Sequence, residues 1–151
     1  MTKIINDQPL PLELTHLIRN GEWPVTDENC IARFDEVKYS LGWEGQVQFL
    51  SLAGMEAGTN DLLNLVQNNS GSYYGMFSSR VKNYDRPKDG WIDVTKVILI
   101  SSNFDEEFLC LDYRNSVQTP CLVAIDYSTS LNRWKTIFHD FSEFLKFLGI
   151  T

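Results

Sequence analysis

The residues from Val97 to Tyr127 read VILISSNFDEEFLCLDYRNSVQTPCLVAIDY and contain three strand-like segments in close succession. The run Val97–Ile100 is apolar on both faces, which predicts a strand near the middle of a sheet. Glu107–Tyr113 and Cys121–Tyr127 follow, and the connection between them ends in Pro120, which is tolerated at the start or edge of a strand. Because consecutive strands joined by a short connection usually pair, we expect these two segments to lie side by side and antiparallel.

A closing helix is predicted downstream of this hairpin, after an extended piece at Asn132–Phe138. Asp140 is suited to cap the helix N-terminus, and Glu143 stands three residues later, as in an acidic relative of the capping box. Gly149 is a typical residue just past a helix C-terminus. Between these points the spacing predicts one apolar stripe that faces a core, formed by Phe141, Phe144, Leu145 and Leu148.

Upstream of Val97 the signals are weaker. Apolar residues at helical spacing from Leu10 to Ile18, with Gly21 after them, predict a short amphipathic helix. The pattern of Trp23–Gly45 leaves the type of that segment open between strand and ragged helix. Gln46–Leu52 alternates in the manner of a strand, although neither face is cleanly polar.

The two glycines Gly54 and Gly58 predict a loop, and Thr59 or Asn60 is expected to cap a short helix behind it. The core-facing residues of that helix are predicted to be Leu62, Leu63, Leu65 and Val66. The stretch 72–90 then reads as an aromatic strand followed by a solvated connection with breaker residues.

The composition is that of a single globular domain spanning residues 1–151. The hydrophobic share of 43% and the charged share of 22% lie in the globular range, and this length is sufficient for one core. The N-terminus lacks the apolar core of a signal peptide and no apolar run reaches the length of a membrane span, which predicts a cytoplasmic protein without membrane contact. A net charge of −7 disfavours nucleic acid as a partner; it suits a basic partner or simply keeps the chain in solution.

The sequence contains no recognisable catalytic, cofactor or metal motif. The two histidines, His16 and His139, lack metal-ligand spacing, and the glycines match neither of the common phosphate-binding patterns. The three cysteines include no CxxC pair; we expect buried, reduced thiols, with Cys110 facing Cys121 across the hairpin as the alternative. We therefore predict no cofactor, no metal site, no catalytic residue and a function other than catalysis.

Carboxylates cluster around the predicted hairpin. Asp105, Glu106 and Glu107 immediately precede one strand, and Asp112 lies inside it, two residues before Arg114. Paired carboxylates can perform acid–base chemistry, three at a turn more often form a hydrated hairpin end, and binding of a partner lies between these readings. The pattern favours a structural role over catalysis, with Asp112 expected to pair with Arg114 or to cap a backbone amide.

An ordered set of short motifs extends over the second half of the chain. It runs from Trp91-Ile92-Asp93-Val94 through the acidic turn to Leu111-Asp112-Tyr113-Arg114, and then to Pro120, Trp134 and Phe141-Ser142-Glu143-Phe144-Leu145. This set resembles the SUKH superfamily, and more specifically its Smi-one/Knr-four branch. One departure is the turn Ser102-Asn103-Phe104-Asp105, where family members often carry glycine. The resemblance implies an α+β fold with a twisted, mainly antiparallel sheet packed with helices.

The resemblance also implies a binding function. Many bacterial members are immunity proteins that bind and neutralise toxins, frequently nucleases, and fungal members are intracellular scaffolds. The first hypothesis is therefore an immunity protein whose acidic face binds a basic nuclease toxin. The second is a regulatory or scaffold module of the same fold that binds through an apolar groove, and the third is an uncharacterised enzyme. The binding face is predicted to comprise Asp105, Glu106, Glu107, Asp112, Tyr113, Asp126 and Tyr127.

Overall fold

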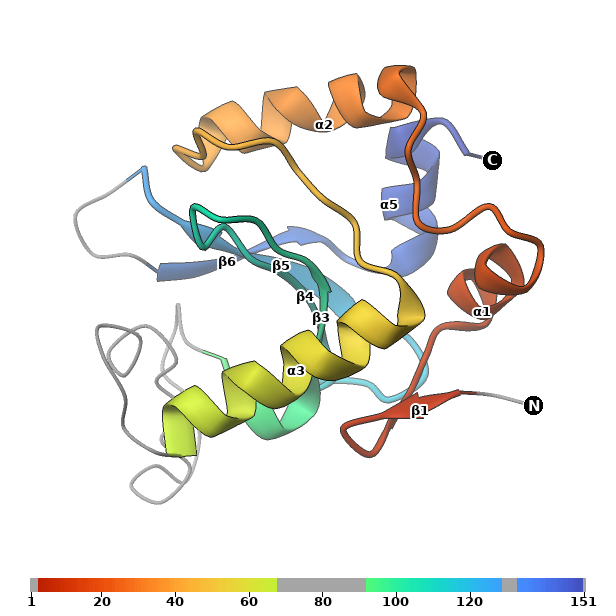
Figure 1. Cartoon of the computed structure of the whole chain (residues 1–151), viewed down its shortest axis with the longest axis vertical. Coiled ribbons are helices and arrows are strands. Elements are labelled where there is room, and N and C mark those ends of the chain that lie inside the picture. The colour runs from red at the N-terminus through yellow and green to blue at the C-terminus, as the bar shows by residue number, and fades with distance from the viewer. Residues whose placement is uncertain (1–2, 68–91, 129–132, 151) are drawn as a thin grey trace.

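The computed structural model describes residues 3–67, 92–128 and 133–150 (Figure 1). At its centre lies a four-stranded antiparallel sheet with the order β3-β4-β5-β6, made of β3 (Val97–Ser101), β4 (Leu109–Asp112), β5 (Cys121–Asp126) and β6 (Arg133–Phe138). The predicted pairing of the two hairpin strands is confirmed, with Leu109 opposite Ala124 and Asp112 opposite Cys121. The predicted α+β class is confirmed as well.

Helices cover both faces of this sheet. The helices of the described residues are α1 (Leu12–Arg19), α2 (Glu28–Ser40), α3 (Leu52–Gln67) and α5 (Phe141–Leu148), with a 3₁₀ turn η1 (Val94–Lys96) before β3. Phe138 of β6 shares a face with Leu122 and packs against Phe144 of α5, with 5.3 Å between the ring centroids. On the opposite face, Gly58 of α3 lies against the side chain of Leu99. Figure 1 accordingly shows α2 and α5 on one side of the sheet and α3 on the other.

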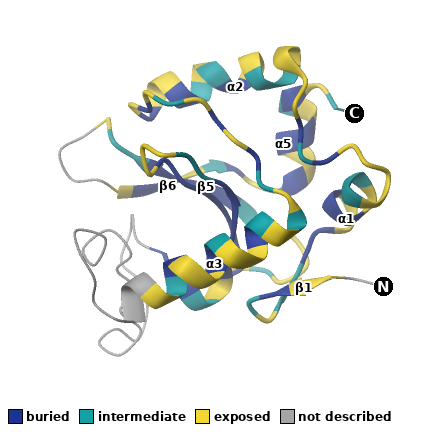
Figure 2. Cartoon of the chain, viewed as in Figure 1, coloured by how far each residue is buried: buried dark blue, intermediate teal, exposed yellow. Residues whose placement is uncertain are grey.

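Because both faces are covered, the central strands carry few polar side chains. All four residues of β4 are buried, as are the four middle residues of β5, and Figure 2 shows the strands as a buried layer between helices whose outer faces are exposed. The buried apolar side chains form one continuous cluster that joins the sheet to all four described helices. This continuity explains why strands with no polar face do not expose apolar surface.

The position predicted for Val97–Ile100 was wrong, because β3 lies at one end of the strand order and not near its middle. Its outer edge is nevertheless closed by polar groups from three other segments. Asn6 Nδ2 donates to the carbonyl of Val97 at 3.0 Å. The Leu99 amide donates to Thr59 Oγ1 at 3.0 Å, and the Leu50 amide donates to the carbonyl of Ile100 at 2.9 Å. Buried backbone groups need such partners, so an edge strand can be as apolar as a central one.

The segment that supplies Leu50 was also mispredicted. Gln46–Leu52 forms only one isolated bridge, between Phe49 and Ser101, and Leu52 already belongs to α3. The loop expected at Gly54 and Gly58 is helix, and Ser51, whose Oγ accepts from the Gly54 amide at 3.1 Å, stands at its N-terminus. A Cβ on Gly58 would lie 2.8 Å from Leu99 Cδ2. This glycine therefore serves close packing of a helix on a strand and does not form a turn.

The remaining helices follow the sequence signals more closely. The segment left open contains α2, which Asp27 caps by accepting from the amides of Asn29 and Cys30. The predictions for α1 and α5 are confirmed. Asp140 accepts from the Glu143 amide at 2.8 Å, and Gly149 ends α5 with a φ of 79°. The predictions for residues 72–90 and for the side chains of Leu65 and Val66 lie outside the described residues.

The cysteines do not face one another. Cys110 is opposite Val123 and Cys121 is opposite Asp112, and all three thiols are free. Cys110 is buried, whereas Cys30 and Cys121 are half-buried. In the part of the chain that the structure describes, none of the helices has the length and apolar character required to cross a bilayer.

A short N-terminal hairpin, β1 (Ile4–Ile5) and β2 (Gln8–Pro9), presents Asn6 to the edge of β3. We expect Asn6→Asp to destabilise the protein by about 1–3 kcal/mol, because it replaces an amide that donates to the carbonyls of Val94 and Val97 by a carboxylate that repels them. Urea unfolding at neutral pH measures this loss. The control is Asp7→Asn at the other left-handed position of the same turn, for which a change within about 0.5 kcal/mol is expected. Equal stability of the two variants would show that the hairpin does not close the sheet edge.

Candidate functional site

The seven predicted binding residues fall at two opposite ends of the sheet. The first end combines the turn between β3 and β4 with the end of β5, because the Ile125 amide donates to the carbonyl of Phe108 at 3.1 Å. It holds Asp105, Glu106, Glu107, Asp126 and Tyr127. The second end, where β4 terminates, holds Asp112 and Tyr113. The structure therefore does not bring the predicted residues together on one surface.

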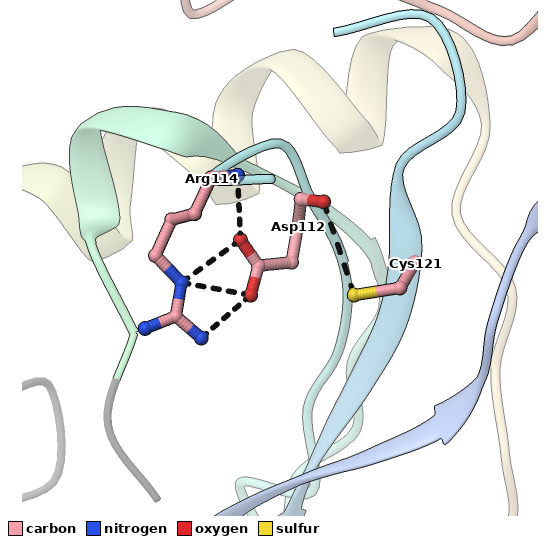
Figure 3. A network of polar contacts seen from close by, with 3 residues as sticks. All are labelled: Asp112, Arg114 and Cys121. Atoms are coloured by element: carbon pink, nitrogen blue, oxygen red, sulfur yellow. Dashed lines mark hydrogen bonds and ion pairs between the residues drawn. The ribbon is translucent and has the colours of Figure 1, made fainter. Parts of the chain in front are cut away.

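Asp112 is a structural carboxylate. Its side chain is 3% exposed and pairs with Arg114, whose Nε and Nη2 donate to Oδ2 at 3.0 and 2.8 Å. Asp112 Oδ1 also accepts from the backbone amide of Arg114 at 3.0 Å (Figure 3). Asp112 thus both pairs with the Arg114 side chain and caps a backbone amide, which are the two roles that the sequence predicted as alternatives. Because its charge is compensated and buried, Asp112 does not belong to a binding surface.

Tyr113 is also withdrawn from the surface. Its side chain is 3% exposed, and its hydroxyl donates to the carbonyl of Pro9 at 2.7 Å. This bond connects the N-terminal hairpin to the end of β4. Tyr113 is therefore a contact within the protein and is not available as an aromatic anchor for a partner. Burial raises the pKa of the Tyr113 phenol well above its usual value.

Glu107 is the second buried carboxylate, with 3% of its surface exposed. It accepts from the backbone amides of Glu44 and Gly45 at 2.6 and 3.0 Å and from Asn103 Nδ2 at 2.8 Å. Charged acceptors form stronger hydrogen bonds than neutral ones. Glu107 therefore clamps the β3–β4 turn to the segment that follows α2, and it is not available to a partner.

The turn Asn103–Glu107 is held from several directions, and we call it the Phe104 turn. Asn103 Oδ1 accepts from the amides of Asp105 and Glu107 at 2.9 and 3.3 Å, and Asn103 Nδ2 donates to the carbonyl of Gln46 at 3.0 Å. On the other side, the hydroxyl of Tyr127 donates to the carbonyl of Glu106 at 2.6 Å. The Asn103 side chain thus organises the Phe104 turn.

Phe104 stands at the tip of this turn with its side chain 100% exposed. The exposed side chains of Asp105 and Glu106 follow it, and exposed Glu44 belongs to the segment clamped by Glu107. We call Phe104, Glu44, Asp105 and Glu106 the Phe104 surface. The sequence prediction included Asp105 and Glu106 but missed Phe104 and Glu44. A large apolar residue inside the polar run SSNFDEE was the signal available for Phe104.

Asp126 and Tyr127 support this surface more than they extend it. Asp126 accepts from the Ser128 amide at 2.8 Å, and exposed Arg133 stands opposite it in the register of β5 and β6. Burial, together with the charges of Glu106 and Glu107, raises the pKa of Tyr127 to about 12. Its hydroxyl therefore remains a donor to the Phe104 turn at neutral pH. Partial desolvation raises the pKa of Glu106 above its ordinary value.

The exposed side chains at this end of the sheet provide an aromatic ring and negative charge. Within residues 3–67, 92–128 and 133–150, no three His, Cys, Asp or Glu side chains gather as a metal site would require. Two small pockets of about 150 and 200 Å³ lie beside the N-terminal hairpin, and none of the seven predicted residues lines them. The Phe104 surface presents one exposed aromatic ring and three exposed acidic residues on a backbone held by hydrogen bonds.

Comparison with protein-family models, with curated proteins and with solved structures found no match for the chain. The resemblance of its motifs to the SUKH superfamily stays a prediction.

We expect Glu107→Ala to destabilise the protein by about 2–4 kcal/mol, because it leaves the amides of Glu44 and Gly45 without their acceptor. The matched control is Asp105→Ala, which removes an exposed carboxylate from the same turn and should change the free energy of unfolding by about 0.5 kcal/mol at most. Urea unfolding at neutral pH compares the two variants. Equal losses would contradict the clamp assigned to Glu107.

Stability is expected to fall in alkaline solution. The unfolded chain releases the Tyr127 proton near the ordinary pKa of 10.0, whereas the folded chain holds it to about 12. The stabilising contribution is therefore complete below pH 10 and is lost as pH rises through the folded pKa. Urea midpoints measured at about pH 9 and about pH 11 test this, with tyrosinate absorbance as the titration signal. Tyr127→Phe should make the decline smaller without abolishing it, because buried Tyr113 also has a raised pKa. An unchanged decline would contradict the assignment.

Proposed function

We propose that the chain is a protein-binding module without catalytic function and that it binds through the Phe104 surface. The observation that carries this proposal is the fully exposed ring of Phe104 on a turn that hydrogen bonds hold on both sides. Aromatic anchors contribute a large share of binding energy at interfaces. An anchor on a fixed backbone also loses little conformational entropy on binding.

Charge supports a basic protein as the partner. Glu44, Asp105 and Glu106 are exposed on the Phe104 turn and on the segment clamped to it, and the whole chain carries a net charge of −7. Such a field accelerates encounter with a cationic surface and disfavours an anionic one. Nucleic acid is therefore a poor partner, and a protein that itself binds nucleic acid through a cationic cleft is a good one.

The resemblance to the SUKH superfamily supports a specific form of this function. In that form the chain is a cytoplasmic immunity protein that binds and neutralises a cognate toxin. A basic nuclease fits both the charge of the Phe104 surface and the toxins that many family members neutralise. Inhibition would follow from covering the cationic cleft that nucleic acid needs.

A second candidate is a regulatory or scaffold module that binds through apolar surface. Its support lies in the N-terminal segment, where Ile4 and Leu12 are each 61% exposed. In the same part of the molecule a pocket is lined by Leu10, Ile18 and Leu52 together with Lys3, Thr15 and Arg19. Binding there would change little with salt, because apolar contacts are not screened. Salt dependence therefore separates the two candidates.

Co-expression with each candidate toxin encoded beside this gene tests the proposed function, with growth rescue and complex formation as readouts. We expect Phe104→Ala to weaken the complex by about ten-fold or more, since the ring is the anchor. Glu106→Lys should slow association and reduce its salt dependence. The control is Glu22→Lys, an exposed residue in the loop after α1 with the same change of charge. If the variants of the turn bind and rescue as well as this control, the Phe104 surface is not the binding site.

A further inference from the structure

The chemistry of the Phe104 surface indicates which group of the partner it receives. The ring of Phe104 is 100% exposed, so its π-face is accessible along with its edge. Asp105 and Glu106 are exposed beside it in the same turn. The Asp105 carboxylate is held near the backbone, because its Oδ2 occupies the space that a Cβ on Gly45 would need. An accessible π-face and two exposed carboxylates on the same short turn favour a cation.

This site has no cation of its own in the described part of the chain. The ion pairs there join Lys3 to Glu56, Lys38 to Asp35 and Arg114 to Asp112, so none of them occupies Asp105 or Glu106. Tyr39, the other exposed aromatic residue among those that the structure describes, already has Lys38 Nζ 5.5 Å from its ring centroid. The Phe104 turn therefore offers a ring and two carboxylates that no ion pair within the described residues compensates.

Arginine matches this combination better than lysine does. The guanidinium is planar and weakly hydrated, stacks on aromatic faces and donates in a fork that fits a carboxylate. The ammonium of lysine is compact and strongly hydrated, so it interacts with the carboxylates as a point charge and gains less from the ring. The discriminating feature is thus the π-face of Phe104, because carboxylates alone attract both residues.

We infer that the Phe104 surface is an arginine-binding site, in which an arginine side chain of the partner lies on the Phe104 ring and donates to the carboxylates of Asp105 and Glu106. This inference rests on the proposed function, since it names the group that the same surface receives. It limits the partner to proteins that expose arginine at the centre of their contact surface. A nuclease that holds nucleic acid with arginine would satisfy this requirement.

Two probe peptides test the inference on the full chain without knowledge of the partner. They are blocked peptides in which three arginines, or three lysines, alternate with glycine, and both are titrated at low salt by NMR. We expect the arginine peptide to bind about two- to five-fold more tightly, the range of an exposed cation–π contact, and to shift the amide signals of residues 103–107. Equal affinities, or shifts confined to other residues, would overturn the inference.

Two substitutions of the exposed ring separate stacking from other contacts. Phe104→Leu keeps apolar bulk but removes the π-face, so it should abolish the preference for arginine as fully as Phe104→Ala does. Asp105→Asn with Glu106→Gln should weaken both peptides together. Glu22→Gln should change neither. A preference for arginine that survives Phe104→Leu would contradict the stacking geometry.

The outcomes distinguish the inference from the proposed function. If Phe104→Ala abolishes toxin binding while the peptides show no preference, the inference of an arginine-binding site is refuted and the proposed function is retained. If the peptides behave as expected and no neighbouring toxin binds, the site stands and the immunity function falls.

Discussion

The rest of the structure depends on one constraint, which is that the backbone groups at the outer edge of β3 need hydrogen-bond partners. A sheet buried on both faces cannot leave backbone amides and carbonyls exposed to apolar surroundings at its edge. Here the partners come from Asn6, Leu50 and Thr59, which belong to three separate segments. The hydrogen bonds that the backbone of β3 requires at its edge therefore position the N-terminal hairpin, the segment before α3 and α3 itself.

The candidate site follows from the same arrangement. The amide of Leu50 pairs with the carbonyl of Ile100, and the Ser102 amide pairs with the carbonyl of Gln48 at 3.2 Å. These bonds bring the backbone of Glu44 and Gly45 within reach of Glu107. The Glu107 carboxylate then holds the Phe104 turn in place. An exposed ring and its neighbouring carboxylates are thus supported by a buried carboxylate that contributes no charge to the surface.

Burial divides the acidic residues of the hairpin into two functional kinds. Glu107 and Asp112 are nearly inaccessible, and each is surrounded by donors from the chain itself. Asp105 and Glu106 are exposed and leave their charge available. Local sequence does not separate Glu106 from Glu107, which are adjacent and chemically identical. Their difference arises because the turn directs one side chain toward the loop after α2 and the other toward solvent.

The elements determined by the sequence alone are those specified by neighbouring residues. The caps Asp140 and Gly149 with an apolar stripe between them determined α5, and two apolar strands joined by a short polar connection determined the pairing of β4 with β5. The tertiary structure decided what depends on distant partners: the edge position of β3, the helical state of Gly54 and Gly58, the burial of Tyr113 and the exposure of Phe104. The physical reason is that capping and periodicity act within a few residues, whereas burial and edge satisfaction are set by segments that meet only in the folded chain.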